Sequence, residues 1–456
     1  MIQVIMLSFF GLILGIALTQ SIWVACMWGL GFPYILFSMF QLKKSFVFTV
    51  AIVPFYVVIP ISIYFKEKID LAELVVFIPF VVWLMSTGQR KRRLVAGSVS
   101  LSIVILLGLS LVSLAAAPLL AQGILAWSRL ILYFILFYLT ASLTQNKVDI
   151  GVILNTIILV GVLSAFYAFY QWAFGVEEVL FSQFLAPQRD LVPNVQFSIQ
   201  RVSSIAGYCN MYATYLIMVI PLTFSSVLYY HVKGDRRLSA MLLIAVVVLL
   251  LALFSTLTRG AIVSSIVSLL FVALMLKKKR LVLLLLAAFT FTGCLLFLYF
   301  PWEVLVNRFQ DFEPSFNSRI DMWAFILNIF QEHPLIGIGP GQLWHLYQLN
   351  GENLWFCLLA ELGLLGTLTF AIHFVLLMAK CIKISALSYQ ETGKFVAAGI
   401  AGSIVAIVLD SLVDPTLMAS KQNLLMFGVL AGLIEAVDRI YEKKLMPRND
   451  RHILLR

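Results

Sequence analysis

Long apolar runs alternate with short polar connections along the whole chain. A helix needs about 20 apolar residues to cross the hydrocarbon core of a bilayer. Fourteen runs of roughly that length occur, at about 3–19, 21–41, 46–64, 70–87, 95–118, 123–144, 149–173, 208–231, 237–257, 260–276, 281–300, 354–380, 394–413 and 422–440. Only Gln20 separates the first two runs, and the tenth is short. The pattern predicts an all-α, polytopic integral membrane protein with about 12–14 transmembrane helices.

Basic residues follow every second run. The clusters are Lys43 and Lys44, Arg90 to Arg93, Lys147, Lys233 with Arg236 and Arg237, Lys277 to Arg280, Lys380 with Lys383, and Lys443, Lys444 and Arg448. Because positive residues mark cytoplasmic connections, we expect these connections and both termini to be cytoplasmic. The connections 174–207, 258–260, 301–353 and 414–421 are then expected on the outer face.

Composition narrows the class of function. The chain is 62% hydrophobic and only 12% charged, whereas an ordinary soluble domain has roughly 25% charged residues. Its net charge of +10 comes from clusters beside predicted spans, which indicates membrane orientation and no nucleic-acid partner. The five cysteines stand singly, so no disulfide framework or zinc site is predicted. The motifs GxxxxGK[ST], HExxH and GxSxG are absent, and no cofactor is expected.

The predicted outer loop 301–353 is acidic, with six carboxylates against Arg308 and Arg319 and no lysine. Its segment NSRIDMWAFILNIF predicts a short amphipathic helix that begins after Asn317 or Ser318. The apolar stripe of this helix would contain Ile320, Trp323, Ile326, Leu327 and Phe330. The following HPLIGIGPGQ predicts a packed turn that returns the chain to the membrane.

Three arginines stand among apolar or small residues on the predicted outer face: Arg201, Arg259 and Arg319. The planar, always charged guanidinium binds phosphate through paired hydrogen bonds, and charged residues at membrane depth are usually functional. Arg201 or Arg319 taken alone is equally consistent with an interfacial anchor or a salt bridge, whereas these structural roles fit Arg259 less well because it stands between two predicted spans. Three on one face favour an anionic ligand, and Gly260 would allow a phosphate to approach the backbone closely.

Four segments together resemble the O-antigen ligase and polymerase superfamily, the membrane glycosyltransferases of bacterial surface polysaccharide assembly. They are RVSSIAGYCNMYATYLIMVIPL at 201–222, STLTRGAIVSSIVSLL at 255–270, SRIDMWAFILNIFQEHPLIGIGPGQ at 318–342 and ENLWFCLLAELGLLG at 352–366. The resemblance covers about residues 195–370, and it rests on the order of the motifs rather than on any one of them.

The resemblance implies a GT-C-like fold and a metal-independent transfer on the outer face of the bacterial cytoplasmic membrane. The donor would be a glycan on undecaprenyl diphosphate. Ligases use a lipid A core sugar as the acceptor, whereas polymerases use a second lipid-linked unit. By motif, Arg259 and Arg319 would bind the donor diphosphate, and Arg201 with Asn210 would line the same cavity.

One position departs from the ligase pattern. Ligases of this family carry a histidine immediately before the asparagine of the last motif, whereas this chain has Glu352 before Asn353. A glutamate can accept a proton from a sugar hydroxyl, so Glu352 is the candidate base, and the change favours a polymerase-like transfer. Asn353, Glu361 and His345 are further candidates for contact with the substrate, with His345 expected at the rim.

Three regions are predicted: N-terminal transmembrane helices in 1–194, a ligase- or polymerase-like core in 195–380, and C-terminal helices with a basic tail in 381–456. A transporter or flippase of an anionic or lipid-linked substrate is the main alternative to the enzyme, followed by a non-catalytic assembly partner. Transporters are typically built from internal repeats with charged or broken helices at mid-depth. No convincing repeat occurs here, and the unusual residues gather on one side, which favours the transferase.

Overall fold

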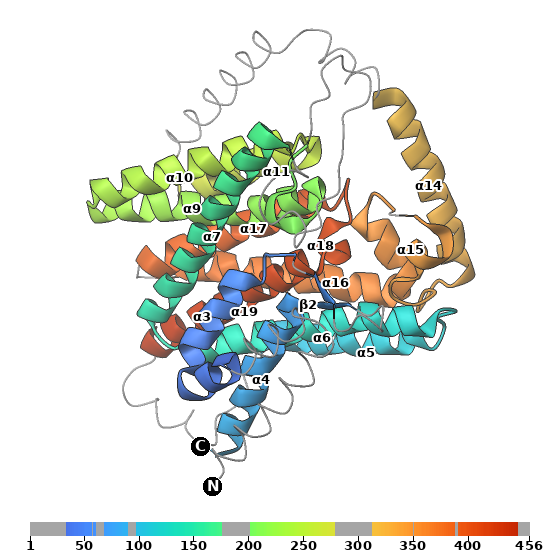
Figure 1. The fold of residues 1–456 in the computed structure, drawn as a ribbon, viewed down its shortest axis with the longest axis horizontal. Coiled ribbons are helices and arrows are strands. Elements are labelled where there is room, and N and C mark those ends of the chain that lie inside the picture. The colour runs from blue at the N-terminus through green and yellow to red at the C-terminus, as the bar shows by residue number, and fades with distance from the viewer. Residues whose placement is uncertain are drawn as a thin grey trace.

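The computed structural model describes residues 33–56, 58–60, 68–89, 97–175, 201–278, 312–349, 351–387 and 391–445. Two of the predicted spans, 3–19 and 281–300, and most of 21–41 and of the connection 174–207 lie outside these residues. The described part is a bundle of helices with one short antiparallel pair of strands (Figure 1). In this pair, β1 (Val58–Pro60) runs against β2 (Lys68–Asp70), with Val58 opposite Asp70.

Six helices in the described part are long and apolar enough to cross a membrane. They are α6 (Leu120–Leu143), α7 (Lys147–Phe174), α9 (Cys209–Lys233), α10 (Arg236–Ser255), α16 (Leu354–Leu387) and α17 (Glu391–Asp410). Shorter apolar segments occur in α4 (Leu71–Gln89), α5 (Ser98–Leu114) and α11 (Arg259–Met275). The prediction of an all-α polytopic membrane protein is confirmed, and the total of 12–14 spans stays a prediction.

Six further helices complete the described elements. They are α3 (Leu42–Ile52), the 3₁₀ turn η1 (Ser204–Ala206), α14 (Phe312–Glu332), α15 (Gln342–Tyr347), α18 (Thr416–Ala419) and α19 (Lys421–Leu445).

Two predicted boundaries are wrong, and proline is involved in both. The run 46–64 is not one helix, because α3 ends at Ile52 just before Pro54, which has no N–H to continue the helical bonds. The amphipathic helix α14 begins at Phe312, ahead of the predicted Asn317 or Ser318. Pro314 falls in its first turn, where the helix needs no N–H donor. The stripe of α14 has Ile326 and Ile329 buried, with Trp323 half-buried, while Ile320 is exposed.

The centre of the bundle is formed by α9 and α17, which pack along each other and against α11. Glycines of α17 permit this close approach: a Cβ on Gly399 would lie 3.2 Å from the Leu222 Cα, and one on Gly402 would lie 2.8 Å from the Pro221 Cβ. Small residues at helix contacts are typical of membrane bundles. In lipid the hydrophobic effect does not drive helices together, so they associate through close van der Waals packing, which small residues allow. The site described below is built at one end of these helices.

One face of α10 is apolar and exposed, with Leu243, Ile244, Val247 and Leu251 each at least half uncovered. A run of exposed aliphatic side chains on a helix of this length is unfavourable in water but natural against lipid. The opposite face of α10 packs against α9 and α7. The exposed face therefore marks part of the lipid-facing surface.

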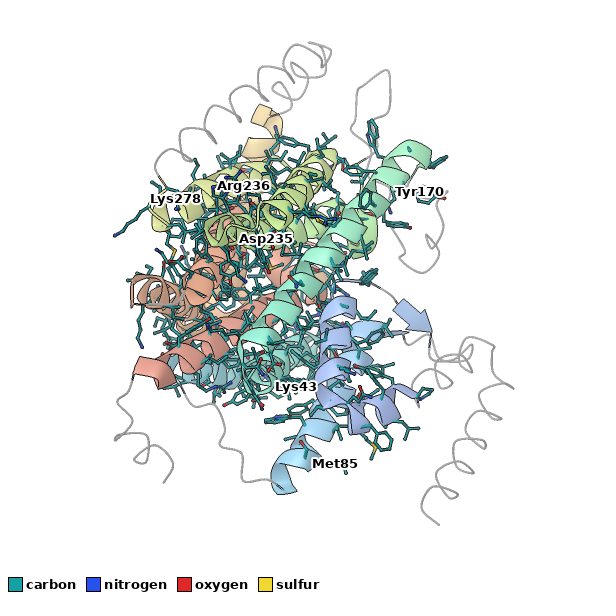
Figure 2. The ribbon with its side chains drawn as sticks, turned by 90° about the vertical axis from the view of Figure 1, so that its left-hand side faces the viewer. Lys43, Met85, Tyr170, Asp235, Arg236 and Lys278 are labelled. Atoms are coloured by element: carbon teal, nitrogen blue, oxygen red, sulfur yellow. The ribbon has the colours of Figure 1, made fainter. Side chains whose placement is uncertain are left out.

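The two ends of the bundle carry different features. At one end, Lys43 pairs with Asp149 at 2.8 Å, and the Lys147 ammonium lies 5.9 Å from the centre of the Tyr441 ring. Figure 2 shows the side of the molecule that lies on the left of Figure 1, with Lys43, Arg236 and Lys278 labelled. At the other end lie α14 and α15, on the right of Figure 1. Lys43, Arg236 and Lys278, from three predicted cytoplasmic clusters, thus lie on one side of the molecule, and α14 and α15 lie on the other.

Candidate active site

Most of the predicted site residues lie around the turn between α17 and α18. We call residues 410–416 the carboxylate turn, because Asp410 ends α17 and Asp414 lies in the turn itself. Thr416, the first residue of α18, bonds through its hydroxyl to that of Thr214 in α9 at 2.6 Å. The turn is therefore tied to the central helix of the bundle.

Arg201 and Asn210 form one hydrogen-bonded unit beside the carboxylate turn. The Arg201 Nη2 donates to Asn210 Oδ1 at 2.6 Å and to Thr258 Oγ1 at 3.0 Å, and its Nε donates to Thr256 O at 2.8 Å. Asn210 lies in the first turn of α9, and its Nδ2 donates to Asp414 Oδ2 at 2.5 Å. The amide therefore links an arginine to a carboxylate without direct contact between the two charges.

Arg259 is the first residue of α11, immediately after the N-cap Thr258. The next residue, Gly260, packs against the carboxylate turn: a Cβ there would lie 2.6 Å from Val413 Cγ2 and 3.6 Å from Asp410 Oδ1. The start of α11, which is the positive end of the helix dipole, thus faces the turn. This arrangement of arginine and helix N-terminus favours an anion.

Arg319 and Glu352 form an ion pair between α14 and the segment before α16. Their side chains are 30% and 39% exposed, while the Arg319 Nε that pairs with Glu352 is itself buried. The backbone of Glu352 has φ +43°, in the left-handed region that a non-glycine residue rarely adopts, and Gly351 has φ +72°. The Trp323 Nε1 donates to Gly351 O at 3.1 Å. Glu352 is therefore held at a strained turn that is braced by α14.

Asn353 fixes this segment against the carboxylate turn. Its Oδ1 accepts from the N–H of Trp355 at 2.9 Å and of Phe356 at 3.2 Å, which caps α16, and its Nδ2 donates to Leu412 O at 2.8 Å. The N–H of Leu354 also donates to Ser411 O at 2.9 Å. Because both ends of the Asn353 amide are used within the protein, the residue places its neighbour Glu352 beside the turn.

The two aspartates of the carboxylate turn were not predicted from the sequence. Thr214 donates to Asp410 Oδ2 at 2.8 Å, while the buried Asp410 Oδ1 has no hydrogen-bond partner among the described residues. Burial raises the pKa of Asp414, and the negative charge of Glu352 raises it further. The sequence pattern that could have indicated them is DSLVDP, which places two acids four residues apart at the end of an apolar run.

Glu361 lies away from the carboxylate turn and organises the glycine-rich segment instead. Its carboxylate accepts from the N–H of Gly341 at 2.9 Å and of Leu343 at 3.1 Å. His345 lies in α15, where its side chain is exposed, and no contact joins it to the carboxylate turn among the described residues. The substrate contacts predicted for these two residues stay predictions.

The segment HPLIGIGPGQ is a packed turn, as predicted, and it fills a break in α16. At Gly363 the helix has φ +67° and ψ −171°. The break leaves backbone groups unpaired, and the turn satisfies them: the N–H of Leu364 donates to Pro334 O at 2.9 Å, and that of Gly339 donates to Glu361 O at 3.0 Å. Backbone groups at membrane depth need such partners, so the turn and the break stabilise each other.

The arrangement supports binding of an anion together with a proton transfer. The side chains of Arg201 and Arg319 and the start of α11 supply positive charge and N–H donors, whereas Glu352 and the two aspartates supply proton acceptors. Both kinds of group lie around the same turn. Such a combination suits a reaction in which a phosphate leaves and a hydroxyl loses its proton.

Comparison with protein families identifies part of the chain. Residues 244–371 match the O-antigen ligase family. This O-antigen ligase segment contains α11, α14, α15 and the start of α16, and with them Arg259, Arg319 and Glu352. It confirms the resemblance to the O-antigen ligase and polymerase superfamily and supports glycosyl transfer in polysaccharide assembly by a membrane enzyme.

The O-antigen ligase segment lies within the predicted core 195–380 and includes three of the four motifs. The first motif, with Arg201 and Asn210, precedes it, yet its side chains bond directly to Thr258 inside the segment. No curated protein matches the chain. The three-region division of the chain stays a prediction.

Proposed function

We propose that this protein transfers a glycan from a polyprenyl diphosphate, of the undecaprenyl type, to a hydroxyl of a glycan acceptor. The observation that carries the proposal is the convergence of Arg201, Arg259 and Arg319 with Glu352 on the carboxylate turn of an O-antigen-ligase-like bundle. The reaction would take place on the outer face of a bacterial cytoplasmic membrane.

The donor diphosphate would bind between Arg319 and the start of α11. Arg319 offers a planar fork for two phosphate oxygens, and the first turn of α11 adds backbone N–H groups beside Arg259. These groups would stabilise the charge that grows on the diphosphate as it leaves. The chemistry in this scheme is carried by protein side chains, and no metal is required.

Because Arg319 is paired with Glu352, binding of the donor would also change the state of Glu352. A phosphate that takes over the Arg319 guanidinium would displace the Glu352 carboxylate and leave it available as a base. The acceptor hydroxyl oxygen would then attack the anomeric carbon, while the bond from that carbon to the phosphate oxygen breaks and the diphosphate departs with the electron pair. The hydroxyl proton would pass to Glu352, and attack from the opposite face would invert the anomeric configuration.

The glutamate at position 352 supports a polymerase-like rather than a ligase-like transfer, because it replaces the histidine expected in ligases. The outer-face location is supported by Lys43, Arg236 and Lys278, which lie on the side of the molecule away from α14 and α15 (Figures 1 and 2). By the positive-inside rule, the basic end is cytoplasmic.

The test uses the purified protein in lipid nanodiscs with a polyprenyl-diphosphate-linked oligosaccharide and a set of acceptors. We expect released polyprenyl diphosphate and a lengthened glycan. Arg259→Ala and Arg319→Ala should each lower turnover by at least about 100-fold, the loss typical of one transition-state donor. Arg237→Ala, at the opposite end, is the matched control and should retain activity.

Two results would count against the proposal. Movement of the intact donor between leaflets of proteoliposomes, without cleavage of the glycan bond, would indicate a flippase. Near wild-type turnover in either Arg259→Ala or Arg319→Ala would remove the phosphate role of that arginine. Thermal melting of each variant verifies that the protein still folds.

A further inference from the structure

A groove lies where the start of α3 meets the joint between α6 and α7, on the side of the molecule away from α14 and α15 (Figures 1 and 2). It consists of a cavity of about 240 Å³ and a second one of about 350 Å³, and Lys43, Lys44 and Leu143 line both. We call it the lysine groove; residues 41–47 and 143–153 form it. The larger cavity is within the roughly 300–1,000 Å³ typical of small-ligand pockets.

The polar part of the lysine groove carries more positive than negative charge. The Lys43 Nζ pairs with Asp149 Oδ2 at 2.8 Å, and the same oxygen accepts from the N–H of Gln145 at 2.8 Å. Lys44 is exposed, and within the described part of the chain it has no hydrogen bond or ion pair. Both lysines lie in the first turn of α3, at the positive end of the helix dipole, where an anion is favoured and a cation is not. The groove therefore offers a place for one further negative charge.

The rest of the lining is apolar and consists of Phe46, Val47, Leu143, Val152 and Ile153. Phe46, Leu143 and Ile153 are buried, whereas Val152 is 42% exposed. A free phosphate or a nucleotide would contact the lysines but would leave this apolar lining unused. An amphiphile with an anionic headgroup matches both parts of the groove.

The apolar lining continues along the outside of α7. Exposed apolar side chains recur at spacings of four, seven, four and three residues, which places them on one face of a helix. They are Val148, Val152, Leu159, Leu163 and Phe166, each at least 42% exposed. Asn155 is also exposed on this face, toward the lysine end. Because Val152 belongs both to the groove and to this face, a molecule bound at the lysines can extend along α7.

We propose that the lysine groove binds an anionic phospholipid of the cytoplasmic leaflet, with its phosphate at Lys43 and Lys44 and an acyl chain along α7. Lys43 and Lys44 form one of the predicted cytoplasmic clusters, and basic pockets between helices on that side of a membrane suit anionic headgroups. The site lies apart from the groups assigned to glycan transfer, so the inference does not depend on the proposed function. The bound phosphate would add a second link between α3 and α7, beside the pair of Lys43 with Asp149, and would stabilise their contact.

The test titrates phosphatidylglycerol into the purified full-length protein in neutral detergent and counts bound lipids by native mass spectrometry. Phosphatidylcholine with the same acyl chains is the neutral comparison. We expect one phosphatidylglycerol to bind more tightly than the others and to raise the melting temperature. Lys44→Gln should weaken this binding by about fivefold, the effect of one lysine near an anionic lipid, whereas Lys44→Arg should bind like the wild type.

Two further variants make the test specific. Lys383→Gln is the matched control, because the Lys383 side chain is 46% exposed, like that of Lys43, but pairs with Asp438 outside the groove. This variant should bind phosphatidylglycerol like the wild type. Asp149→Asn removes the carboxylate that competes for Lys43 and should tighten the binding. A merely structural role of the ion pair predicts no such gain.

Three outcomes would overturn the inference. Equal affinity for phosphatidylglycerol and phosphatidylcholine would mean that the lysines do not recognise a net negative headgroup. An equal loss in Lys44→Gln and Lys383→Gln would indicate general surface charge instead of a site. Preferential binding of a polyprenyl phosphate over phosphatidylglycerol, abolished by Lys44→Gln, would assign the groove to a carrier lipid. If Lys44→Gln melts early without lipid, Asp149→Asn decides, since unchanged or weaker binding in that variant contradicts the proposal.

Discussion

Glu352 combines three properties that seldom occur together in one residue. It has a left-handed backbone, it pairs with an arginine of a different helix, and its charge acts on a buried aspartate. A left-handed non-glycine residue costs of order 1–3 kcal/mol, and such strain is concentrated at functional sites. Because the neighbouring Asn353 amide holds the segment in place, the strain is maintained by the surrounding structure.

Substitution of Glu352 should separate its two effects. Glu352→Gln removes the base and also the competition for Arg319, so we expect kcat to fall by about 100-fold or more and the KM for the donor to fall as well. Glu352→His keeps a proton acceptor and should retain much of the activity, with a pH profile shifted toward the histidine pKa. Steady-state kinetics at a series of pH values would measure kcat and the donor KM of both variants and the pH profile of Glu352→His. Equal activity of the Gln variant and the wild type would exclude a role as base.

The site residues differ in how far the sequence could reveal them. Arg259 and Arg319 were predictable because arginines are conspicuous between apolar runs. Asp410 and Asp414 were not, since acids at the end of a run resemble an ordinary polar boundary until the fold brings Asn210 and Thr214 against them. Glu361 was predicted to contact substrate, but only the fold shows the backbone N–H groups that its carboxylate accepts.

At the scale of elements, the break in α16 is the feature that sequence periodicity does not predict. The run 354–380 is mostly apolar, and Gly363 is one of two glycines in it. The break arises from tertiary contact, because the turn 334–339 supplies the hydrogen bonds that the helix gives up. The short α18 and the early start of α14 were missed for a similar reason. Helix interiors follow from periodicity, whereas their ends depend on partners elsewhere in the chain.

A substitution at the break should destabilise the protein strongly. A Cβ on Gly363 would lie 2.3 Å from the Leu335 carbonyl oxygen, and the φ of +67° disfavours any L side chain. We expect Gly363→Ala to lower the free energy of unfolding by roughly 3 kcal/mol. Thermal melting in detergent would measure the change. Gly108→Ala in α5 is the control, because nothing lies within 4 Å of its Cβ, and it should melt at or slightly above the wild-type temperature.

At the scale of the whole molecule, hydropathy and charge predicted the class of fold, and the described residues agree with it over six long apolar helices. Hydropathy counts apolar residues but does not show that Pro54 interrupts the helix, so it predicts a span over 46–64 where α3 ends at Ile52. The pairing of helices could not be predicted. The contact of α9 with α17 depends on Gly399 and Gly402, whose role is visible only against their neighbours.

The orientation of the bundle leads to a direct labelling experiment. In a cysteine-free background, Trp344→Cys in α15 should react with a membrane-impermeant thiol reagent in intact cells, since Trp344 is 46% exposed at the predicted outer end. Arg237→Cys should react only after the membrane is permeabilised. The reverse pattern would place the candidate site on the cytoplasmic side and contradict the positive-inside assignment.

The contact between the glycine-rich turn and α16 also limits how this chain can be recombined with proteins of similar sequence. The turn 334–339 and the helix around Gly363 complete each other's backbone hydrogen bonds, so neither is a self-sufficient module. A chimera that imports only the outer loop of a similar protein would lack the matching break in α16, so the backbone hydrogen bonds between the two would not form. Grafts meant to change acceptor preference should therefore exchange residues 312–366 as one cassette, with the seam placed inside the unbroken part of α16.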